Sequence, residues 1–199
     1  MIKPTVIVVG NGMVGYKFCE KLVARSADFN IIVFGEEPRH AYDRVHLSEY
    51  FSGRSADDLS MSTFSWYQEN NITLHVNDPV LEINRPAKTV SSMSGLNLKY
   101  DFLVLATGSS AFVPDIPGVQ KEGVFVYRTI EDLDLMMTDL LDKIGRARTE
   151  YLDAGEGGSA DERLEKLVYG RFLDAEPRKL FFETYKDVEA LGEILSPSS

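Results

Sequence analysis

The stretch TVIVVGNGMVGYKFCEKLVARSADFNIIVFGEE, residues 5–37, decides the fold that we predict for this chain. It opens with an unbroken apolar run at residues 6–9, which is typical of a strand buried on both faces of a parallel sheet. A helical pattern follows, because Val14, Phe18 and Leu22 fall four residues apart and would line one helix face. This order of a buried strand and a helix predicts an α/β fold.

A glycine-rich turn joins this strand to this helix. With the spacing G-x-G-x-x-G, it comprises Gly10, Asn11, Gly12, Met13, Val14 and Gly15. In such turns the first glycine permits the tight bend, and the second lets the backbone approach a pyrophosphate. The third lets the helix pack closely on the strand, and the helix N-terminus offers unpaired N–H groups to phosphate oxygens. The turn therefore predicts a dinucleotide site, with a merely structural strand–helix–strand turn as the alternative.

A second apolar run, residues 31–34, leads to Glu36 and Glu37, about 20 residues beyond the last glycine of the turn. A carboxylate at the tip of the second strand can accept hydrogen bonds from both hydroxyls of a ribose, which fits an unphosphorylated adenosine ribose. Strand, turn, helix, second strand and acid thus stand in the order that dinucleotide binding requires. The pattern does not choose between NAD and FAD.

The composition fits a globular chain and argues against several classes of protein. A net charge of −10 with no basic run argues against a nucleic-acid partner. The single cysteine, Cys19, is expected to be a buried thiol in the first helix, and it leaves no disulfide framework or C-x-x-C pair. His40 and His46 have no third ligand nearby, so no metal site is predicted. No apolar run approaches roughly 18 residues and no signal sequence is evident, so we expect a soluble, cytoplasmic protein with no membrane partner.

Residues 38–53 are polar and aromatic without a clean period, and they predict a solvated loop with a little helix. Within them, Arg44 is a candidate for a place beside a pyrophosphate, because a guanidinium fork suits phosphate oxygens. An ordinary surface arginine is the alternative. Residues 55–71 predict a helix or a helix pair, whose core face would comprise Leu59, Met61, Phe64 and Tyr67.

Short strand candidates follow at residues 73–76, 80–83, 89–92 and 97–100, separated by turn chemistry. Their alternation predicts an antiparallel meander that crosses back over the sheet, rather than another strand–helix–strand unit. Such a meander would form a layer of its own beside the parallel strands.

Another doubly buried strand is predicted at residues 102–106, FLVLA, and it ends at Thr107 and Gly108. Its carboxyl end should emerge at the same sheet edge as the glycine turn, where open α/β sheets bind ligands. One more short strand is expected at residues 124–127. A helix should begin just after it, with Thr129 as its N-cap and an acid three residues later as a capping-box partner.

Four stretches together resemble one family: GNGMVG at 10–15, FGEEPRHAYDRVHLSEYFSG at 34–53, YDFLVLATGS at 100–109 and FVYRTIEDLD at 125–134. They resemble the N-terminal FAD-binding segment of pyridine-nucleotide-dependent flavoprotein reductases. Within that family the AYDRVHLSEYF stretch is similar to the large subunits of NAD(P)H-dependent nitrite reductases. The resemblance covers about residues 4–135.

The resemblance implies that the first glycine loop binds FAD rather than NAD, and that the chemistry is hydride transfer from NAD(P)H to the flavin. The family's cofactor contacts fall here on Gly10, Gly12 and Gly15 at the pyrophosphate, Glu36 at the adenosine ribose, Arg44 near the phosphates and flavin, Val80 at adenine through its backbone, and Ala106, Thr107 and Gly108 beside the cofactor. The resemblance therefore leans towards an FAD-dependent oxidoreductase, and it identifies no catalytic residue in this chain.

The sequence departs from the family in ways that limit this inference. The family's second G-x-G-x-x-G unit, which binds NAD(P)H, has no counterpart here, and no cysteines are available for an iron–sulfur cluster or sirohaem. We therefore expect the chain to hold roughly the ADP half of FAD, to be inactive alone and to meet NAD(P)H only through a missing domain or partner. The alternatives are a non-enzymatic adenine-nucleotide-binding module whose tail docks a protein partner, and a truncated or fused fragment.

The predicted fold is α/β: a Rossmann-like, three-layer FAD-binding domain with an antiparallel β-meander crossover over residues 1–135, and an α-helical C-terminal tail over residues 136–199. Residues 153–160 are expected to be a flexible acidic linker within the tail. Residues 161–199 are similar to a helical segment near the C-terminal end of type I restriction-enzyme motor subunits, without their helicase motifs. Two unrelated pieces meeting near residue 135 would indicate a fused or rearranged reading frame.

Overall fold

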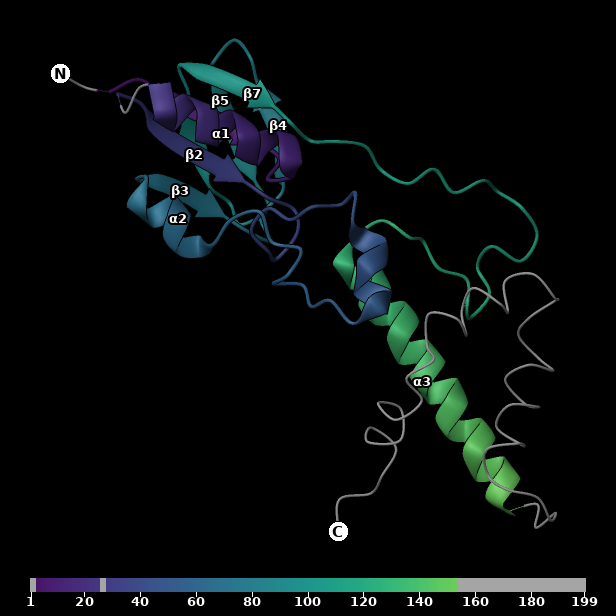
Figure 1. Ribbon diagram of the computed structural model, residues 1–199. Helices are drawn as coiled ribbons and strands as arrows, with labels where there is room; N and C mark the ends of the chain where they lie inside the picture. The colour runs from purple at the N-terminus through teal and green to yellow at the C-terminus, as the bar shows by residue number, and fades with distance from the viewer. Residues whose placement is uncertain (1–2, 26–27, 154–199) are drawn as a thin grey trace. The chain divides into compact units, whose positions relative to one another are not determined.

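The computed structural model describes residues 3–25 and 28–153 of the chain (Figure 1). The chain divides into two compact units, Met1–Pro114 and Asp115–Ser199. The domain boundary that we expect between residues 135 and 136 stays a prediction. The predicted linker and tail beyond Asp153 lie outside the described residues. The protein partner expected for that tail therefore stays a prediction.

A four-stranded parallel sheet forms the centre of the first unit. Its strands are β1 (Thr5–Val9), β2 (Asn30–Phe34), β3 (Ile72–His75) and β7 (Phe102–Leu105), in the order β3-β2-β1-β7 (Figure 1). All three pairings are parallel, and β1 lies between β2 and β7. The predictions of strands near residues 6–9 and 31–34 are therefore confirmed, as is the α/β class.

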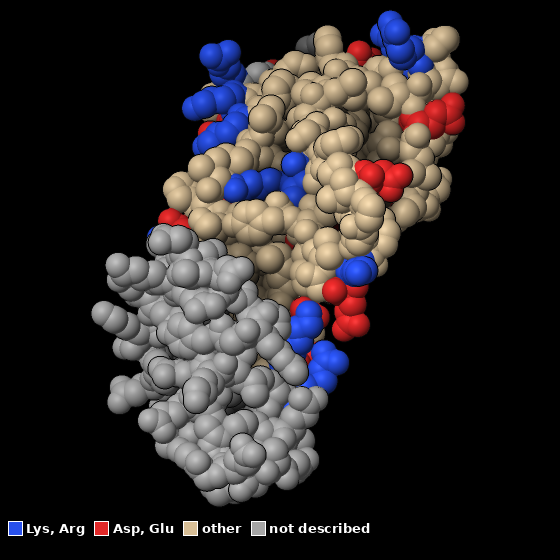
Figure 2. All heavy atoms as spheres, turned by 90° about the vertical axis from the view of Figure 1, so that its right-hand side faces the viewer, with Lys and Arg blue, Asp and Glu red and all other residues tan. Residues whose placement is uncertain are grey.

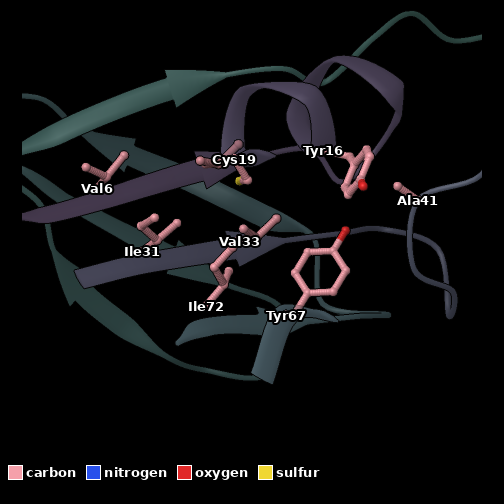
Figure 3. Close-up of a cluster of buried hydrophobic side chains, with 9 residues drawn as sticks. Val6, Tyr16, Cys19, Ile31, Val33, Ala41, Tyr67 and Ile72 are labelled. Atoms are coloured by element: carbon pink, nitrogen blue, oxygen red, sulfur yellow. The ribbon is translucent and has the colours of Figure 1, made fainter. Parts of the chain in front are cut away.

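The unbroken apolar sequence of β1 follows from its position, because both of its faces are covered. Val6 and Val8 pack with Cys19 in a cluster on the helical side of the sheet (Figure 3). Ile7 and Val9 belong to a second cluster on the opposite side. Since side chains alternate along a strand, an apolar residue is needed at every position.

Helix α1 (Met13–Arg25) covers one face of the sheet, and its buried residues are Gly15, Tyr16 and Cys19. Phe18 and Leu22 are partly buried against the same cluster, as expected. The prediction that Val14 lies on this face is wrong, because its side chain is 71% exposed. The close packing of Gly15 sets the rotation of the helix, so that the neighbouring position turns outwards.

Residues 55–71 contain much less helix than the sequence suggests, since α2 spans only Phe64–Glu69. The hydroxyl of Thr63 caps α2 by accepting a hydrogen bond from the Trp66 N–H at 3.1 Å. Residues 56–59 form a turn, and Ser60 after it forms an antiparallel bridge with Tyr42. This pairing satisfies backbone groups that a longer helix would otherwise have used.

The meander is made of three strands, β4 (Val80–Asn84), β5 (Thr89–Ser92) and β6 (Asn97–Lys99), in antiparallel order. It packs through Val90 on Ile7, Val9 and Phe34 of the parallel sheet, so the first unit has the three predicted layers. The prediction that the candidate at residues 73–76 joins this meander is wrong. That strand, β3, pairs parallel with β2 because α2 provides the crossover between them.

Strand β7 lies at an edge of the sheet, so the prediction that it is buried on both faces is wrong. Phe102 is 56% exposed and Leu105 is 63% exposed. Within the described residues β7 pairs only with β1, so its apolar sequence is that of an inner strand placed at an edge. The strand expected at residues 124–127 is also absent, and these residues form an irregular segment of the second unit.

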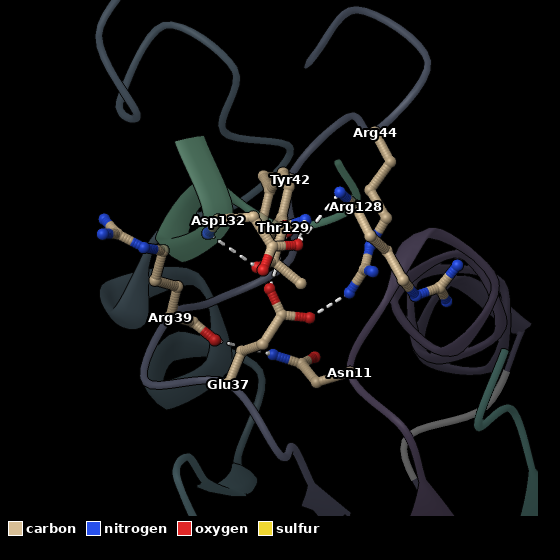
Figure 4. Close-up of polar contacts among 8 residues, drawn as sticks. All are labelled: Asn11, Glu37, Arg39, Tyr42, Arg44, Arg128, Thr129 and Asp132. Atoms are coloured by element: carbon tan, nitrogen blue, oxygen red, sulfur yellow. Dashed lines mark hydrogen bonds and ion pairs between the residues drawn. The ribbon is translucent and has the colours of Figure 1, made fainter. Parts of the chain in front are cut away.

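The second unit contains α3 (Ile130–Asp153), which begins where the sequence predicts. The predicted capping box is formed: Thr129 Oγ1 accepts from the Asp132 N–H at 3.1 Å, and Asp132 Oδ2 accepts from the Thr129 N–H at 2.8 Å (Figure 4). Neither α3 nor any other helix in the described residues combines the length and apolar character needed to cross a membrane.

A buried carboxylate joins the meander to the loop that precedes it. Asp78 is 5% exposed and accepts hydrogen bonds from Ser92 Oγ at 2.9 Å and from both the N–H and the Oγ of Ser94, at 2.8 and 2.7 Å. Burial alone would raise the pKa of Asp78, but the hydrogen bonds from Ser94 and Ser92 outweigh it and keep the pKa below its ordinary value. The folded first unit therefore favours the charged form of this side chain.

We expect Asp78→Asn to lower the free energy of unfolding by about 1–3 kcal/mol at neutral pH, because the amide keeps only one of the two oxygens that accept from Ser92 and Ser94. Since the folded pKa is lowered, the stabilisation is present above the unfolded pKa of about 3.9 and is lost as pH falls through the folded pKa. Urea unfolding across pH should show the two proteins converging below about pH 4. The exposed Asp57→Asn is the control, and an equal loss in both variants would contradict the expectation.

We also expect Thr129→Ala to destabilise the start of α3 by about 1 kcal/mol, because the first turn loses its cap. Thr138 lies within the same helix, where its hydroxyl only donates to the Asp134 carbonyl, so Thr138→Ala should be neutral or slightly stabilising. Amide hydrogen exchange in the first turn of α3 would measure both effects. Equal exchange rates in Thr129→Ala and the wild type would refute the capping role.

Candidate functional site

The glycine turn lies at the carboxyl edge of the sheet, between β2 and β7. The Gly10 N–H donates to the Phe34 carbonyl at 2.8 Å, and the Ala106 N–H donates to the Val9 carbonyl at 2.8 Å. The ends of three neighbouring strands therefore converge on this turn, as predicted for the ligand edge of an open α/β sheet.

Two glycines of the turn are required by the packing of the protein itself. A Cβ on Gly10, whose φ is +109°, would lie 2.2 Å from the Ala106 carbonyl oxygen. A Cβ on Gly15 would lie 2.0 Å from the Gly10 carbonyl oxygen. Both distances are far below van der Waals contact, so these positions hold the turn, the helix and β7 together.

Gly12 is different, because a Cβ there would meet no atom of the protein within 4 Å. Its carbonyl accepts the Tyr16 N–H at 2.9 Å, which places it at the N-terminus of α1. Met13 and Val14 form the first turn of that helix, which contains no acidic residue. N–H groups in a first turn have no partner within the helix, so this end of α1 suits an anion.

Asn11, also a predicted cofactor contact, uses its side chain within the protein. Its Oδ1 accepts the Tyr67 hydroxyl at 2.8 Å, and its Nδ2 lies 3.5 Å from the Arg39 carbonyl oxygen. Sequence reasoning missed Tyr67, which was assigned only to a core face. The one sequence feature that could have indicated this contact is Asn11 itself, because it is the single side chain between Gly10 and Gly12 and is polar.

The two acids at the tip of β2 have different surroundings. Glu37 accepts the Tyr42 hydroxyl at 2.6 Å and forms an ion pair with Arg44 (Figure 4). The Arg44 guanidinium also lies 5.2 Å from the centre of the Tyr42 ring. Glu36, in contrast, is exposed. In this structure Arg44 is held by Glu37. The assignments of Glu36 to a ribose and of Arg44 to the phosphates stay predictions.

The loop that carries Arg44 is fixed by its neighbour Asp43. One carboxylate oxygen accepts the Val45 N–H at 2.9 Å, and the other lies 2.8 Å from Nδ1 of His46. This hydrogen bond with Asp43 raises the pKa of the exposed His46 imidazole and lowers that of Asp43. The pair stabilises the bend of the loop.

Val80, the predicted adenine contact, opens β4 and is partly buried. The loop before it is tied to the tip of β2, because the Asn77 N–H donates to the Glu37 carbonyl at 3.0 Å and the Asp78 N–H to the Gly35 carbonyl at 2.9 Å. The structure thus brings Val80 close to the acids of the β2 tip. An adenine contact there stays a prediction.

The residues after β7 reach the turn in part. Ala106 touches it, since its side chain would lie 3.6 Å from a Cβ on Gly15. Thr107 and Gly108 follow in an exposed, irregular segment, and Gly108 has a φ of +70°. The structure therefore brings together the turn, the β2 tip, the start of β4 and Ala106.

Charged side chains of both signs are dispersed over the described part of the surface in Figure 2. No single basic field dominates the described residues on that face. The thiol of Cys19 is fully buried, as expected, and burial raises its pKa to about 12. A thiol in this environment is an inert core side chain.

Comparisons with known proteins agree with this arrangement. The nitrite reductase NAD(P)H large subunit of Klebsiella oxytoca is 48% identical over 136 residues, which cover 67% of this chain and 14% of that protein. The nitrite reductase NAD(P)H of Emericella nidulans is 42% identical over 206 residues, covering 92% of this chain and 18% of that protein. This second alignment continues past residue 135, so it argues against a junction of unrelated pieces there.

The fold also matches a solved structure, the covalent putidaredoxin reductase–putidaredoxin complex, with a TM-score of 0.61 and 28% identity. The match covers 70% of this chain and 35% of that chain. The chain spans only 14% to 18% of the length of the nitrite reductases to which it is similar. The model of the pyridine nucleotide-disulphide oxidoreductase family matches residues 4–148. The chain therefore belongs to the pyridine nucleotide-disulphide oxidoreductase family.

Proposed function

We propose that this chain binds FAD through its adenosine diphosphate half, as the flavin-binding part of an NAD(P)H-dependent reductase of the nitrite reductase type. One observation carries the proposal: Gly12 is a glycine where the protein has room for a side chain. Glycine loses more backbone entropy on folding than any other residue, so an unneeded glycine at a helix start destabilises the fold. Its benefit is the space that it leaves for a ligand.

The surroundings of Gly12 suit a diphosphate. The open space lies at the N-terminus of α1, where backbone N–H groups and the positive end of the helix dipole favour an anion. The first turn of α1 carries no acidic residue that would repel phosphate. A diphosphate could therefore approach the backbone of the turn closely at Gly12.

We assign different roles to the two acids at the tip of β2, Glu36 and Glu37. Because Glu37 already accepts from Tyr42 and pairs with Arg44, it serves to hold the loop of residues 42–44. Exposed Glu36 is then the carboxylate that we assign to the adenosine ribose. The backbone at Val80 would border the adenine, since its loop is tied to the same strand tip.

Bound FAD would supply the two-electron chemistry, while the protein contributes binding, orientation and electrostatics. The part of the chain that the structure describes contains one glycine turn of this kind, and the proposal assigns it to FAD. The nicotinamide nucleotide would therefore reach the flavin through another domain or a partner. The class of reductase is proposed because the similar proteins are named nitrite reductases. Nitrite as the electron acceptor rests on those names alone.

The test is to purify the full chain, record its flavin absorbance and titrate it with FAD and ADP by calorimetry. We expect Gly12→Ala to keep its free energy of unfolding within about 0.5 kcal/mol of the wild type, since nothing surrounds the added methyl group. Its affinity for ADP should fall about tenfold or more, or roughly 1.4 kcal/mol, because the methyl group occupies the diphosphate's place. Gly15→Ala is the contrasting variant, and it should lose stability by about 3 kcal/mol through overpacking. A Gly12→Ala chain that binds ADP like the wild type would refute the proposal.

A second pair of variants separates the two acids. Glu36→Gln should weaken ADP binding about tenfold, because the ribose loses a charged acceptor. We expect that Glu37→Gln has its main effect on stability, lowering the free energy of unfolding by about 1 kcal/mol as the half-buried Arg44 loses its partner. Calorimetry and urea unfolding on both variants measure this difference. The reverse pattern would assign the ribose to Glu37.

A further inference from the structure

The side chain of Asn11 makes two hydrogen bonds at the centre of the glycine turn and lies close to the tip of β2. Its Oδ1 accepts the Tyr67 hydroxyl at 2.8 Å, and its Nδ2 lies 3.5 Å from the Arg39 carbonyl oxygen. A Cβ on Gly35 would come within 3.0 Å of the Asn11 Cβ, so the side chain passes close to the tip of β2. Figure 4 shows Asn11 beside Glu37 and Arg39. No other side chain lies between Gly10 and Gly12.

Tyr67 brings a hydroxyl to this point from inside the core. It belongs to α2, is 1% exposed and packs in the cluster on the helical side of the sheet (Figure 3). Its ring meets that of Trp66 edge-on, with ring centres 5.0 Å apart. Ser62 Oγ donates to the Tyr67 oxygen at 3.4 Å, which leaves the hydroxyl proton for Asn11. Burial raises the pKa of Tyr67, so this donor keeps its proton at physiological pH.

The turn needs such an anchor because of its composition. Glycine has the widest range of backbone conformations, and close contacts restrict Gly10 but not Gly12, so the Gly12 side of the turn keeps conformational freedom that an anchored Asn11 can restrict. A ligand that binds a mobile turn must also offset the entropy lost as the turn becomes ordered. A rigid, buried hydroxyl bonded to the one available side chain removes part of that freedom before the ligand arrives.

We infer that Tyr67 is a positioning residue for the diphosphate site: through its hydrogen bond to Asn11, it holds the glycine turn in the conformation that presents backbone N–H groups to the ligand. This inference rests on the proposed function. It assigns the α2–β3 segment a part in cofactor affinity, although Tyr67 itself touches no ligand.

The test uses the full chain and ADP as the probe, titrated by calorimetry. Tyr67→Phe keeps the ring in the core and removes only the hydroxyl, so the dissociation constant for ADP should rise about three- to tenfold. Tyr16→Phe is the matched control, because Tyr16 lies in the same cluster and its hydroxyl contacts Glu20 instead, at 3.4 Å. Its affinity for ADP should equal that of the wild type.

A double-mutant cycle distinguishes positioning from a general loss of stability. If Tyr67 acts through Asn11, adding Tyr67→Phe to Asn11→Ala should cause no further rise in the dissociation constant. The amide resonance of Gly12 in the ligand-free protein should also broaden or shift in Tyr67→Phe and stay unchanged in Tyr16→Phe. If Tyr67→Phe does not fold, Asn11→Ala removes the same hydrogen bond, and an unchanged affinity in that variant overturns the inference.

The failures of the two proposals can be told apart. A wild-type chain that binds neither ADP nor FAD overturns the proposed function and this inference with it. A wild-type chain that binds ADP, with Tyr67→Phe binding equally well, overturns the inference alone. Additive losses in the double mutant also overturn it, because Tyr67 would then act by a route other than Asn11.

Discussion

The contact between the start of α1 and the turn after β1 is the constraint on which the first unit depends. Gly15 lies so close to the Gly10 carbonyl, and Gly10 so close to the Ala106 carbonyl, that no side chain fits at either position. This contact fixes the rotation of α1, and therefore which residues of the helix face the sheet. It also brings the ends of β1 and β7 together and so forms the edge at which we propose that the ligand binds.

Much of this arrangement follows from local pattern. The run at residues 6–9 could be assigned to a doubly buried strand because apolar residues occupy both of its faces, and the structure covers both. The glycine spacing predicted the turn because Gly10 and Gly15 are required by close backbone contacts within it, while Gly12 leaves open space at the helix start. The cap of α3 was predictable for the same reason, since Thr129 and Asp132 act on groups within one turn of themselves.

The features that the sequence did not predict depend on contacts between distant residues. Val14 fits the helical period as well as Phe18 does, and only the close packing of Gly15 turns it outwards. β3 alternates like a meander strand, but the short α2 returns the chain to the parallel sheet. Tyr67 and Asn11 are 56 positions apart, so neither residue type nor spacing indicates their hydrogen bond. Such pairings are properties of the folded topology.

The negative net charge of the chain does not by itself disfavour an anionic ligand, because the first turn of α1 carries no acidic residue and Arg44 pairs with Glu37 at the tip of β2. Charges farther away than about 8 Å are largely screened at physiological ionic strength. Close to the tip of β2, the Arg44 guanidinium offsets the charge of Glu37, whereas the Asp78 carboxylate keeps its charge and accepts hydrogen bonds from Ser92 and Ser94. A guanidinium has five N–H donors, and the ion pair with Glu37 uses one terminal nitrogen. Arg44 therefore need not release Glu37 to meet a phosphate, so the same residue can hold the loop and favour the ligand.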